Sequence, residues 1–318
     1  MLDHILVPLD GSPLAECVIP HTVALARAFD ARVTLLQVLG RTKATGRIQA
    51  IDPLDWHIRK AEARSYLDEV ATRLKEAGLG TDKVILEGRA AERIVEFAHN
   101  QNVSLIVLSS HGRSGLSGWN ISGVVQKTIL RAGMPTMIVR AYQSVTQDVT
   151  ALQYRRVLVP LDCSQRAECV LPLAIALARF HKSQLLLAHI VSRPEMPRRA
   201  PLTPEDIGLA DHITKRNQLE ASRYLRQLQS RLSSDTRIRL SVNDNVASTL
   251  HNLVKQEDID LVLLSAHGYS GETKWPYGSV ALNFIAYGTT PLLIVQDLSQ
   301  DELESTQAET AAREYKGH

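Results

Sequence analysis

A motif near the N-terminus of this chain returns, almost unchanged, 152 positions later. His4–Ser12 has the sequence HILVPLDGS, and Arg156–Ser164 has the sequence RVLVPLDCS. A second motif, SSHGRSG at Ser109–Gly115, returns as SAHGYSG at Ser265–Gly271, at an offset of 156. Repeats of this length are whole domains, because solenoid units span only about 20 to 50 residues. The chain is therefore expected to contain two copies of one fold.

Short apolar runs alternate with longer helical patterns in both copies. The runs are rich in β-branched residues and mostly apolar, which is typical of strands covered on both faces of a parallel sheet. In the first copy they are Ile5–Leu9, Val33–Leu39, Val84–Leu86, Leu105–Leu108 and Thr136–Val139. The helical patterns between them are Pro13–Phe29, Leu54–Ala77, Ala90–Asn100 and Ile121–Ala132. The second copy has the same order, with strands near Val157, Leu185, Ile238, Leu261 and Leu292. The predicted fold class is α/β, with two tandem copies of a doubly wound, mostly parallel five-stranded sheet flanked by helices.

Composition shifts along the chain predict its domain boundaries. A polar, Thr-containing stretch separates the last strand of one copy from the first strand of the next, as is typical of a linker. We expect a first domain over residues 1–142, a linker over 143–154, a second domain over 155–298 and a polar C-terminal tail over 299–318.

The overall composition, 44% hydrophobic and 22% charged, is that of a soluble globular protein. Lys and Arg exceed Asp and Glu by only two and are scattered among them, so no nucleic-acid-binding face is expected. No apolar run reaches about 18 residues, and the N-terminus lacks the pattern of a leader. We therefore expect a cytoplasmic protein that does not bind membranes. Its three cysteines show no metal-binding spacing, so no metal site is expected.

An acid and a hydroxyl follow the first predicted strand of each copy. They are Asp10 with Ser12, and Asp162 with Ser164. In an open parallel sheet, ligands bind beyond the carboxyl ends of the strands, where the strand order reverses. Asp10 and Asp162 are therefore candidates to contact an adenosine moiety. The alternative is that both pairs only cap the helix that follows.

Glycines follow the fourth predicted strand of each copy, where the main chain can approach a ligand without a Cβ in the way. These glycines are Gly112 and Gly115 in the first copy, and Gly268 and Gly271 in the second. Gly278 and Ser279 come next at the start of a predicted helix, whose free N–H groups would face a phosphate. The pattern lacks the Gly-Lys-Ser/Thr of a P-loop, and it does not follow the first strand as a dinucleotide fingerprint would.

A histidine precedes the loop glycine in both copies, at His111 and His267. No Asp, Cys or second His lies nearby in the sequence to orient either ring. We therefore expect both to pack the loop or face solvent, and we assign no catalytic residue.

Each half of the chain resembles a universal stress protein domain. The resemblance rests on the blocks Ile5–Asp10, Ser109–Gly112, Ser122–Gly123 and Met134–Val139, with their counterparts in the second copy. It implies a fold of the adenine nucleotide alpha hydrolase-like class. It also implies binding of ATP or another adenine nucleotide, with Mg²⁺ accompanying the phosphates. Nucleotide-binding members carry Gly, two residues, Gly, nine residues, Gly, then Ser or Thr.

The second copy keeps this pattern better than the first. It agrees at three of four positions, and the first copy at only one. The positions are Ser265, Gly268, Gly278 and Ser279 in the second copy, and Ser109, Gly112, Ser122 and Gly123 in the first. A Ser in place of the first Gly adds a Cβ, although its hydroxyl can donate to a phosphate. The resemblance thus favours a site in the second copy. The residues that it places against the adenine are Val38 and Ile190.

The resemblance also implies a role in the stress response and a mode of assembly. The last strands, around Ile138 and Ile294, would pair the two domains as a covalent pseudo-dimer, and a second chain would complete a homodimer. Two alternatives stay open. One is an interaction-only protein with decayed nucleotide sites. The other is a slow ATP hydrolase, for which the only candidate acid and lysine near the predicted phosphate-binding glycines of the second copy are Asp162 and Lys274.

Overall fold

The structure is a computed structural model that describes residues 2–40, 53–113, 121–141, 148–196, 202–232, 235–269 and 276–297. Its contacts group the chain into two compact units. One comprises Met1–Gln153 and Ile285–Leu293, and the other comprises Tyr154–Phe284 and the chain from Ile294 onward. We call the elements up to β5 the first repeat and those from β6 onward the second repeat.

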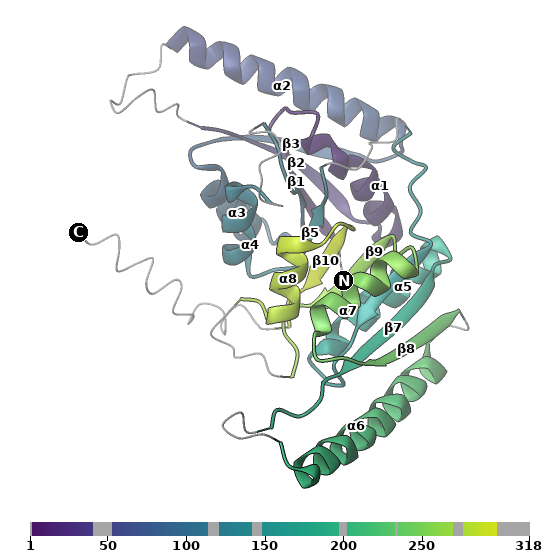
Figure 1. The fold of residues 1–318 in the computed structure, drawn as a ribbon. Coiled ribbons are helices and arrows are strands. Elements are labelled where there is room, and N and C mark those ends of the chain that lie inside the picture. The colour runs from purple at the N-terminus through teal and green to yellow at the C-terminus, as the bar shows by residue number, and fades with distance from the viewer. Residues whose placement is uncertain are drawn as a thin grey trace, which may run out of the picture. The chain divides into compact units, whose positions relative to one another are not determined.

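The first repeat alternates strands and helices in the predicted order (Figure 1). Its strands are β1 (His4–Pro8), β2 (Arg32–Leu39), β3 (Thr81–Glu87), β4 (Leu105–Ser109) and β5 (Thr136–Val139). Its helices are α1 (Val18–Phe29), α2 (Pro53–Glu76), α3 (Ala90–Asn100) and α4 (Gly123–Ala132). A short 3₁₀ turn, η1 (Ala15–Cys17), precedes α1, so the predicted first helix begins later than its sequence pattern.

The second repeat follows the same plan. Its strands are β6 (Arg156–Pro160), β7 (Gln184–Val191), β8 (Thr236–Val242), β9 (Leu261–Ser265) and β10 (Leu292–Val295). Its helices are α5 (Leu171–His181), α6 (Pro204–Arg231), α7 (Val246–Gln256) and α8 (Ser279–Tyr287), and the 3₁₀ turn η2 (Ala167–Val170) precedes α5. None of the helices in the described ranges is long and apolar enough to cross a lipid bilayer.

The strand order is the doubly wound one in each repeat. It is β3-β2-β1-β4-β5 in the first repeat and β8-β7-β6-β9-β10 in the second. β1 pairs in parallel with both β2 and β4, and β6 pairs in parallel with both β7 and β9. The chain therefore reverses its direction across the sheet between β1 and β4, and between β6 and β9. This confirms the predicted fold class and places a switch point at the end of the first strand of each repeat.

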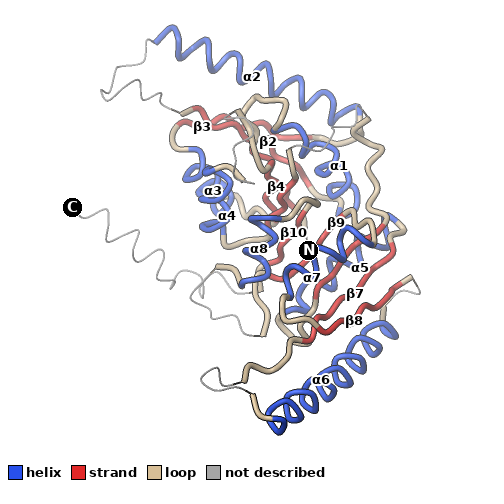
Figure 2. The backbone as a smooth tube through the Cα atoms, in the orientation of Figure 1, coloured by secondary structure: helices blue, strands red, loops and turns tan. Residues whose placement is uncertain are grey.

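Right-handed crossovers put the helices of each repeat on both faces of its sheet. In the first repeat α3 and α4 pack together on one face, and α1 lies on the other (Figure 1). In the second repeat α6 runs along β7 and β8 (Figure 2). The central strands are fully buried, as at Ile5, Leu6, Leu158 and Leu263. The edge strands β3 and β8 are only partly covered, so the prediction that all strands are buried on both faces is wrong at the edges.

Candidate functional site

Each repeat has a cavity at the carboxyl ends of its strands, at the switch point. The cavity of the second repeat has a volume of about 860 Å³, and that of the first about 560 Å³. Both volumes lie in the range of small-molecule sites, roughly 300 to 1,000 Å³. The cavity of the second repeat is walled by apolar side chains from β7, α7 and β9, among them Ile190, Leu250 and Leu264.

The predicted site residues come together at these two cavities. The second cavity is lined by Asp162, Ile190, Ser265, Gly268, Gly278 and Ser279. The first is lined by Asp10, Val38, Ser109, Gly112, Ser122 and Gly123. Gly115, Gly271 and Lys274 lie outside the described residues. Residues up to 120 positions apart in the sequence thus meet at one edge because the carboxyl ends of all parallel strands point the same way.

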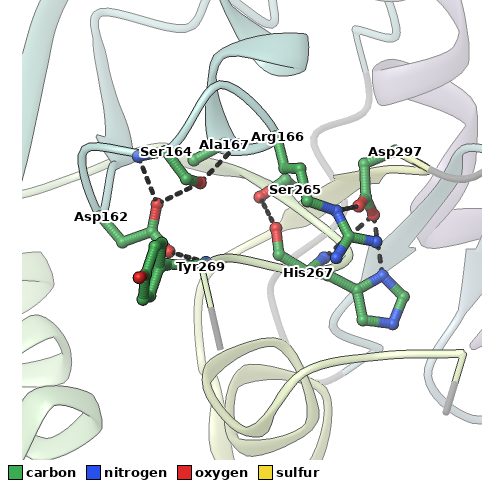
Figure 3. A network of polar contacts seen from close by, with 8 residues as sticks. All are labelled: Asp162, Ser164, Arg166, Ala167, Ser265, His267, Tyr269 and Asp297. Carbon is green, nitrogen blue, oxygen red and sulfur yellow. Dashed lines mark hydrogen bonds and ion pairs between the residues drawn. The ribbon is translucent and has the colours of Figure 1, made fainter. Parts of the chain in front are cut away.

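The acid after the first strand holds two loops together in each repeat. Asp162 Oδ1 accepts hydrogen bonds from the backbone N–H of Ser164 at 3.0 Å and from its hydroxyl at 2.6 Å. Asp162 Oδ2 accepts from the backbone N–H of Tyr269, in the loop after β9. Figure 3 shows the carboxylate between these two partners. Asp10 makes the same contacts with Ser12 and with the backbone N–H of Arg113. Both oxygens are therefore engaged within the protein.

The serine of each pair accepts a hydrogen bond from the first residue of the 3₁₀ turn that follows. Ser164 Oγ accepts from the backbone N–H of Ala167 at 3.1 Å, and Ser12 Oγ accepts from that of Ala15 at 3.3 Å. Neither the 3₁₀ turns nor the helices α1 and α5 after them have a side-chain hydrogen bond at the N-cap, so the capping interpretation stays open. Contact of Asp10 or Asp162 with an adenosine moiety stays a prediction.

The loop glycine is required by this carboxylate. A Cβ built on Gly268 would lie 2.1 Å from Asp162 Oδ2, and one on Gly112 would lie 2.1 Å from Asp10 Oδ2. Such a distance is far inside van der Waals contact, so no larger residue fits while the carboxylate keeps its place. The sequence suggested that these glycines admit a ligand. In the structure, the group that approaches the missing Cβ is the protein's own Asp.

The serine before the loop also turns toward the protein. Ser265 Oγ donates to the carbonyl oxygen of His267 at 2.6 Å, and Ser109 Oγ lies 2.6 Å from that of His111. A hydroxyl has one proton to donate. The expectation that Ser265 donates to a phosphate is therefore not met in this geometry, because that proton is already in use.

The first turn of α8 presents main-chain N–H groups at the second cavity. Gly278 precedes the helix, and its own N–H donates to the carbonyl oxygen of Ala266 at 2.7 Å. Ser279, Val280 and Ala281 follow as the first three helical residues and line the cavity. The N–H groups of a first helical turn have no acceptor within the helix, and the helix dipole makes this end positive. An anionic group in the cavity would find these donors in place.

The corresponding helix in the first repeat is capped by a side chain. Ser122 occupies the position of Gly278, and its hydroxyl accepts from the backbone N–H of Val125 at 3.3 Å. Val125 is the third residue of α4, so the protein itself takes one of the N–H donors of this helix. Gly278 has no side chain that could do the same for α8. The first repeat has Ser122 followed by Gly123, whereas the second has Gly278 followed by Ser279. This reversed order has a structural consequence, because it places a hydroxyl at the N-cap of α4.

A buried ionic network lies beside the second cavity (Figure 3). Asp297 follows β10, and its side chain is only 1% exposed. It accepts from Nδ1 of His267 at 2.8 Å, from the backbone N–H of His267 at 3.1 Å, and from Nε of Arg166 at 2.7 Å. Burial acts to raise the pKa of the Asp297 carboxyl. The hydrogen bond from His267 and the charges of His267 and Arg166 outweigh burial, and the pKa lies below its usual value.

Sequence reasoning missed Asp297 as the partner of His267. The two residues are 30 positions apart, and the histidine was judged only by its sequence neighbours. The signal was available, since a residue just after the last strand of a parallel sheet lies at the same edge as the loop after the fourth strand. The His267 side chain is fully buried, as expected of a loop-packing histidine. In the first repeat Ala141 stands at the position of Asp297, and Nδ1 of His111 lies 3.1 Å from Ser110 Oγ.

His189 is a second polar residue that the sequence analysis did not single out. It lies on β7 and lines the cavity next to the predicted Ile190. Its Nδ1 is 2.7 Å from the carbonyl oxygen of Leu161 and 3.8 Å from Cys163 Sγ. Burial, with the charges of Asp162 and Glu168, raises the pKa of the Cys163 thiol to about 11, so this thiol is protonated at neutral pH. Within the described residues, no group of three His, Cys, Asp or Glu side chains is placed to hold a metal ion.

Comparisons with known proteins agree on one family. The family model described as "Universal stress protein family" matches residues 1–140 and again residues 153–296. A universal stress protein of Methanocaldococcus jannaschii is 29% identical over 137 residues, covering 43% of this chain and 81% of that protein. One of Mycobacterium tuberculosis is 22% identical over 298 residues, covering 92% of this chain and 96% of that protein.

A solved structure shares the fold over almost the whole chain. It is a universal stress protein from Archaeoglobus fulgidus, which superposes with a TM-score of 0.64 at 16% sequence identity. The match covers 94% of this chain and 100% of that one. The two matched segments, the doubly wound sheet of each repeat and the relatives that extend over both repeats lead to one conclusion. This chain belongs to the universal stress protein family, with two of the family's domains in tandem.

Proposed function

We propose that this tandem universal stress protein binds ATP or a related adenine nucleotide in its second repeat and acts in the stress response as a binding and regulatory protein. The observation that carries the proposal is the cavity of about 860 Å³, which is lined both by apolar side chains and by the first turn of α8. Apolar walls suit a base, and helix N–H groups suit a phosphate. Assembly through the last strands and with a second chain stays a prediction from the resemblance.

The residues of the cavity suit an adenine nucleotide in their chemistry. Ile190 and Leu250 offer flat apolar surface for a purine ring, and the N–H groups of Ser279 to Ala281 offer donors for phosphate oxygens. Gly278 also lines the cavity, directly before these N–H groups in the chain. A Cβ built there would meet Ala266 O at 3.5 Å, an ordinary contact, so the fold itself does not require glycine at this position. A glycine that the fold does not require is consistent with space kept for a ligand.

A second candidate is an interaction-only stress protein, and one observation favours it. Among the described residues that line the second cavity there is no Lys or Arg, whereas Arg113 and Lys127 line the first cavity. A nucleotide in the second repeat would therefore rely on the helix N-terminus for its phosphates. The two candidates differ in whether purified protein binds ATP at all.

The first test is to denature freshly purified protein, identify any released small molecule by mass spectrometry, and titrate ATP by calorimetry. We expect about one adenine nucleotide per chain. In a Gly278→Val variant the added side chain is expected to weaken ATP binding by about tenfold or more, because it fills space beside the helix N-terminus. Gly123→Val is the matched control in the first repeat, where a Cβ meets nothing within 4 Å, and it should leave the affinity unchanged.

Two results would overturn the proposal. One is a protein that is empty as purified and does not bind added ATP, which would favour the interaction-only candidate. The other is an affinity that falls with Gly123→Val and not with Gly278→Val, which would move the site to the first repeat. Thermal unfolding of each variant shows that a lost affinity is not caused by a lost fold.

A further inference from the structure

The geometry points to His189 as the residue that selects the base: we propose that Nε2 of His189 accepts a hydrogen bond from the 6-amino group of a purine and thereby discriminates against 6-oxo purines. The inference rests on the proposed nucleotide binding and deepens it. It concerns which nucleotide the second repeat prefers.

The tautomer of His189 is set by the main chain. Its Nδ1 lies 2.7 Å from the carbonyl oxygen of Leu161, and a carbonyl oxygen can only accept a hydrogen bond. Nδ1 therefore carries the proton. Leu161 is held in turn, because its own N–H donates to the carbonyl oxygen of Ala188 at 2.8 Å. The imidazole is thus fixed across the ends of β6 and β7.

A neutral imidazole with a proton on Nδ1 has an acceptor at Nε2. Nε2 makes no hydrogen bond with any residue that the structure describes, and His189 lines the cavity. Its neighbours on the wall are apolar, including Ala188, Ile190 and Leu250. A ring that lies against this part of the wall meets the Nε2 acceptor beside the apolar side chains of Ile190 and Leu250. The ligand edge that satisfies it is an N–H donor.

The exocyclic 6-amino group of adenine is such a donor, whereas hypoxanthine and guanine present a 6-oxo acceptor. Two acceptors facing each other in an enclosed site leave both unsatisfied. That mismatch corresponds to a loss of about tenfold to a hundredfold in affinity. ITP is the sharpest probe, because it differs from ATP only at position 6 and in the proton that N1 consequently carries.

The first repeat provides the matched control. Gln37 occupies the place of His189, but it is only 5% exposed and is not among the residues lining the first cavity. An amide side chain carries both a donor and an acceptor, so it does not select between a donor and an acceptor on the ligand. A Gln37→Leu variant should therefore leave the preference between ATP and ITP unchanged.

The test compares the affinities of ATP and ITP by calorimetry, with the full-length protein and two variants of His189. Wild type is expected to bind ATP at least about tenfold more tightly than ITP. His189→Asn keeps a side-chain N–H for the carbonyl oxygen of Leu161 but removes Nε2, so the ratio should fall toward one. His189→Leu removes both groups and should give the same ratio, with a lower unfolding temperature.

The outcomes separate the inference from the proposed function. Wild type that binds ATP and ITP equally, or a ratio unchanged by His189→Asn, overturns the inference and leaves nucleotide binding intact. A preference for ITP also overturns it, since Nε2 would then face N1–H. If neither nucleotide binds, the proposed function fails and this inference fails with it.

Discussion

The two repeats share the contact between the Asp after the first strand and the loop after the fourth strand, and they differ at the start of the helix that lines the cavity. In both, a carboxylate after the first strand ties down the loop after the fourth strand and lies where a Cβ of the loop glycine would be. They differ at the start of the next helix, where the Ser122 hydroxyl caps α4 and Gly278, at the same position before α8, has no side chain. A motif position kept in both copies can therefore serve the fold, while the role in binding that we propose belongs to the position that differs.

The largest expected effect tests this shared contact. Gly268→Ala and Gly112→Ala should each lower the free energy of unfolding by about 4 kcal/mol, because the added Cβ displaces a carboxylate and its hydrogen bonds. Urea denaturation followed by circular dichroism measures the loss. Gly208→Ala is the control: Gly208 lies in α6 with nothing within 4 Å of a built Cβ, and alanine there should stabilise by about 1 kcal/mol. A cost below about 0.5 kcal/mol at Gly268 would show that the carboxylate moves aside freely.

A slightly smaller effect tests the network that only the second repeat has. Asp297→Asn leaves Arg166 and His267 without their buried charge partner and should lower the free energy of unfolding by about 3 kcal/mol. The same urea titration applies. Asp82→Asn, at an exposed acid of the first repeat, should change stability by less than about 0.5 kcal/mol. Equal effects of the two substitutions would mean that the network contributes no net stability.

The exchange of helix caps tests the difference directly. Gly278→Ser places a hydroxyl at the start of α8 as in α4, where it competes with a phosphate for an N–H group, and ATP affinity should fall about tenfold. Stability should change by only a few tenths of a kcal/mol. Calorimetry gives the affinity. Ser122→Gly should leave ATP binding as it is, and a stronger effect there than at Gly278 would reverse the roles assigned to the two repeats.

The smallest expected effect is on the pH dependence of stability. The pKa of Asp297 is lowered from 3.8 in the folded protein, so its ionised form stabilises the fold above the unfolded pKa. That contribution is lost as the pH falls through the folded value. Wild type should therefore lose stability more steeply below about pH 4 than Asp297→Asn does. Urea midpoints from pH 6 to pH 3 measure the slopes, and parallel curves would contradict this.

Much of the fold was predictable because its signals are local. Short apolar stretches predicted all ten strands, and Thr136–Val139 agrees to the residue with β5. The start of α1 was not predicted, since Pro13 to Phe29 carries one helical pattern but the 3₁₀ turn Ala15–Cys17 comes before the helix, with the N–H of Ala15 donating to Ser12 Oγ. The partial exposure of β3 and β8 was missed because edge position depends on strand order, which no single run encodes.

The candidate site was likewise predictable only in part: its residues could be identified from the sequence, but not their contacts. Asp162, Gly268 and Gly278 were identifiable because strand ends and glycine spacing are visible in one dimension. Their partners were not. That Asp162 fills the space beside Gly268, and that Asp297 holds His267, follows from loops that meet only after the sheet has formed.

By itself the sequence determined that the chain has two copies of a parallel α/β domain, because a repeat and its apolar periodicity are properties of neighbouring residues. It also determined which residues follow the strands. Only the tertiary structure decided what each of them touches, because strand order brings distant loops to one edge. A loop glycine such as Gly268 lines the cavity at this edge, and the space of its missing Cβ is taken by the carboxylate of Asp162.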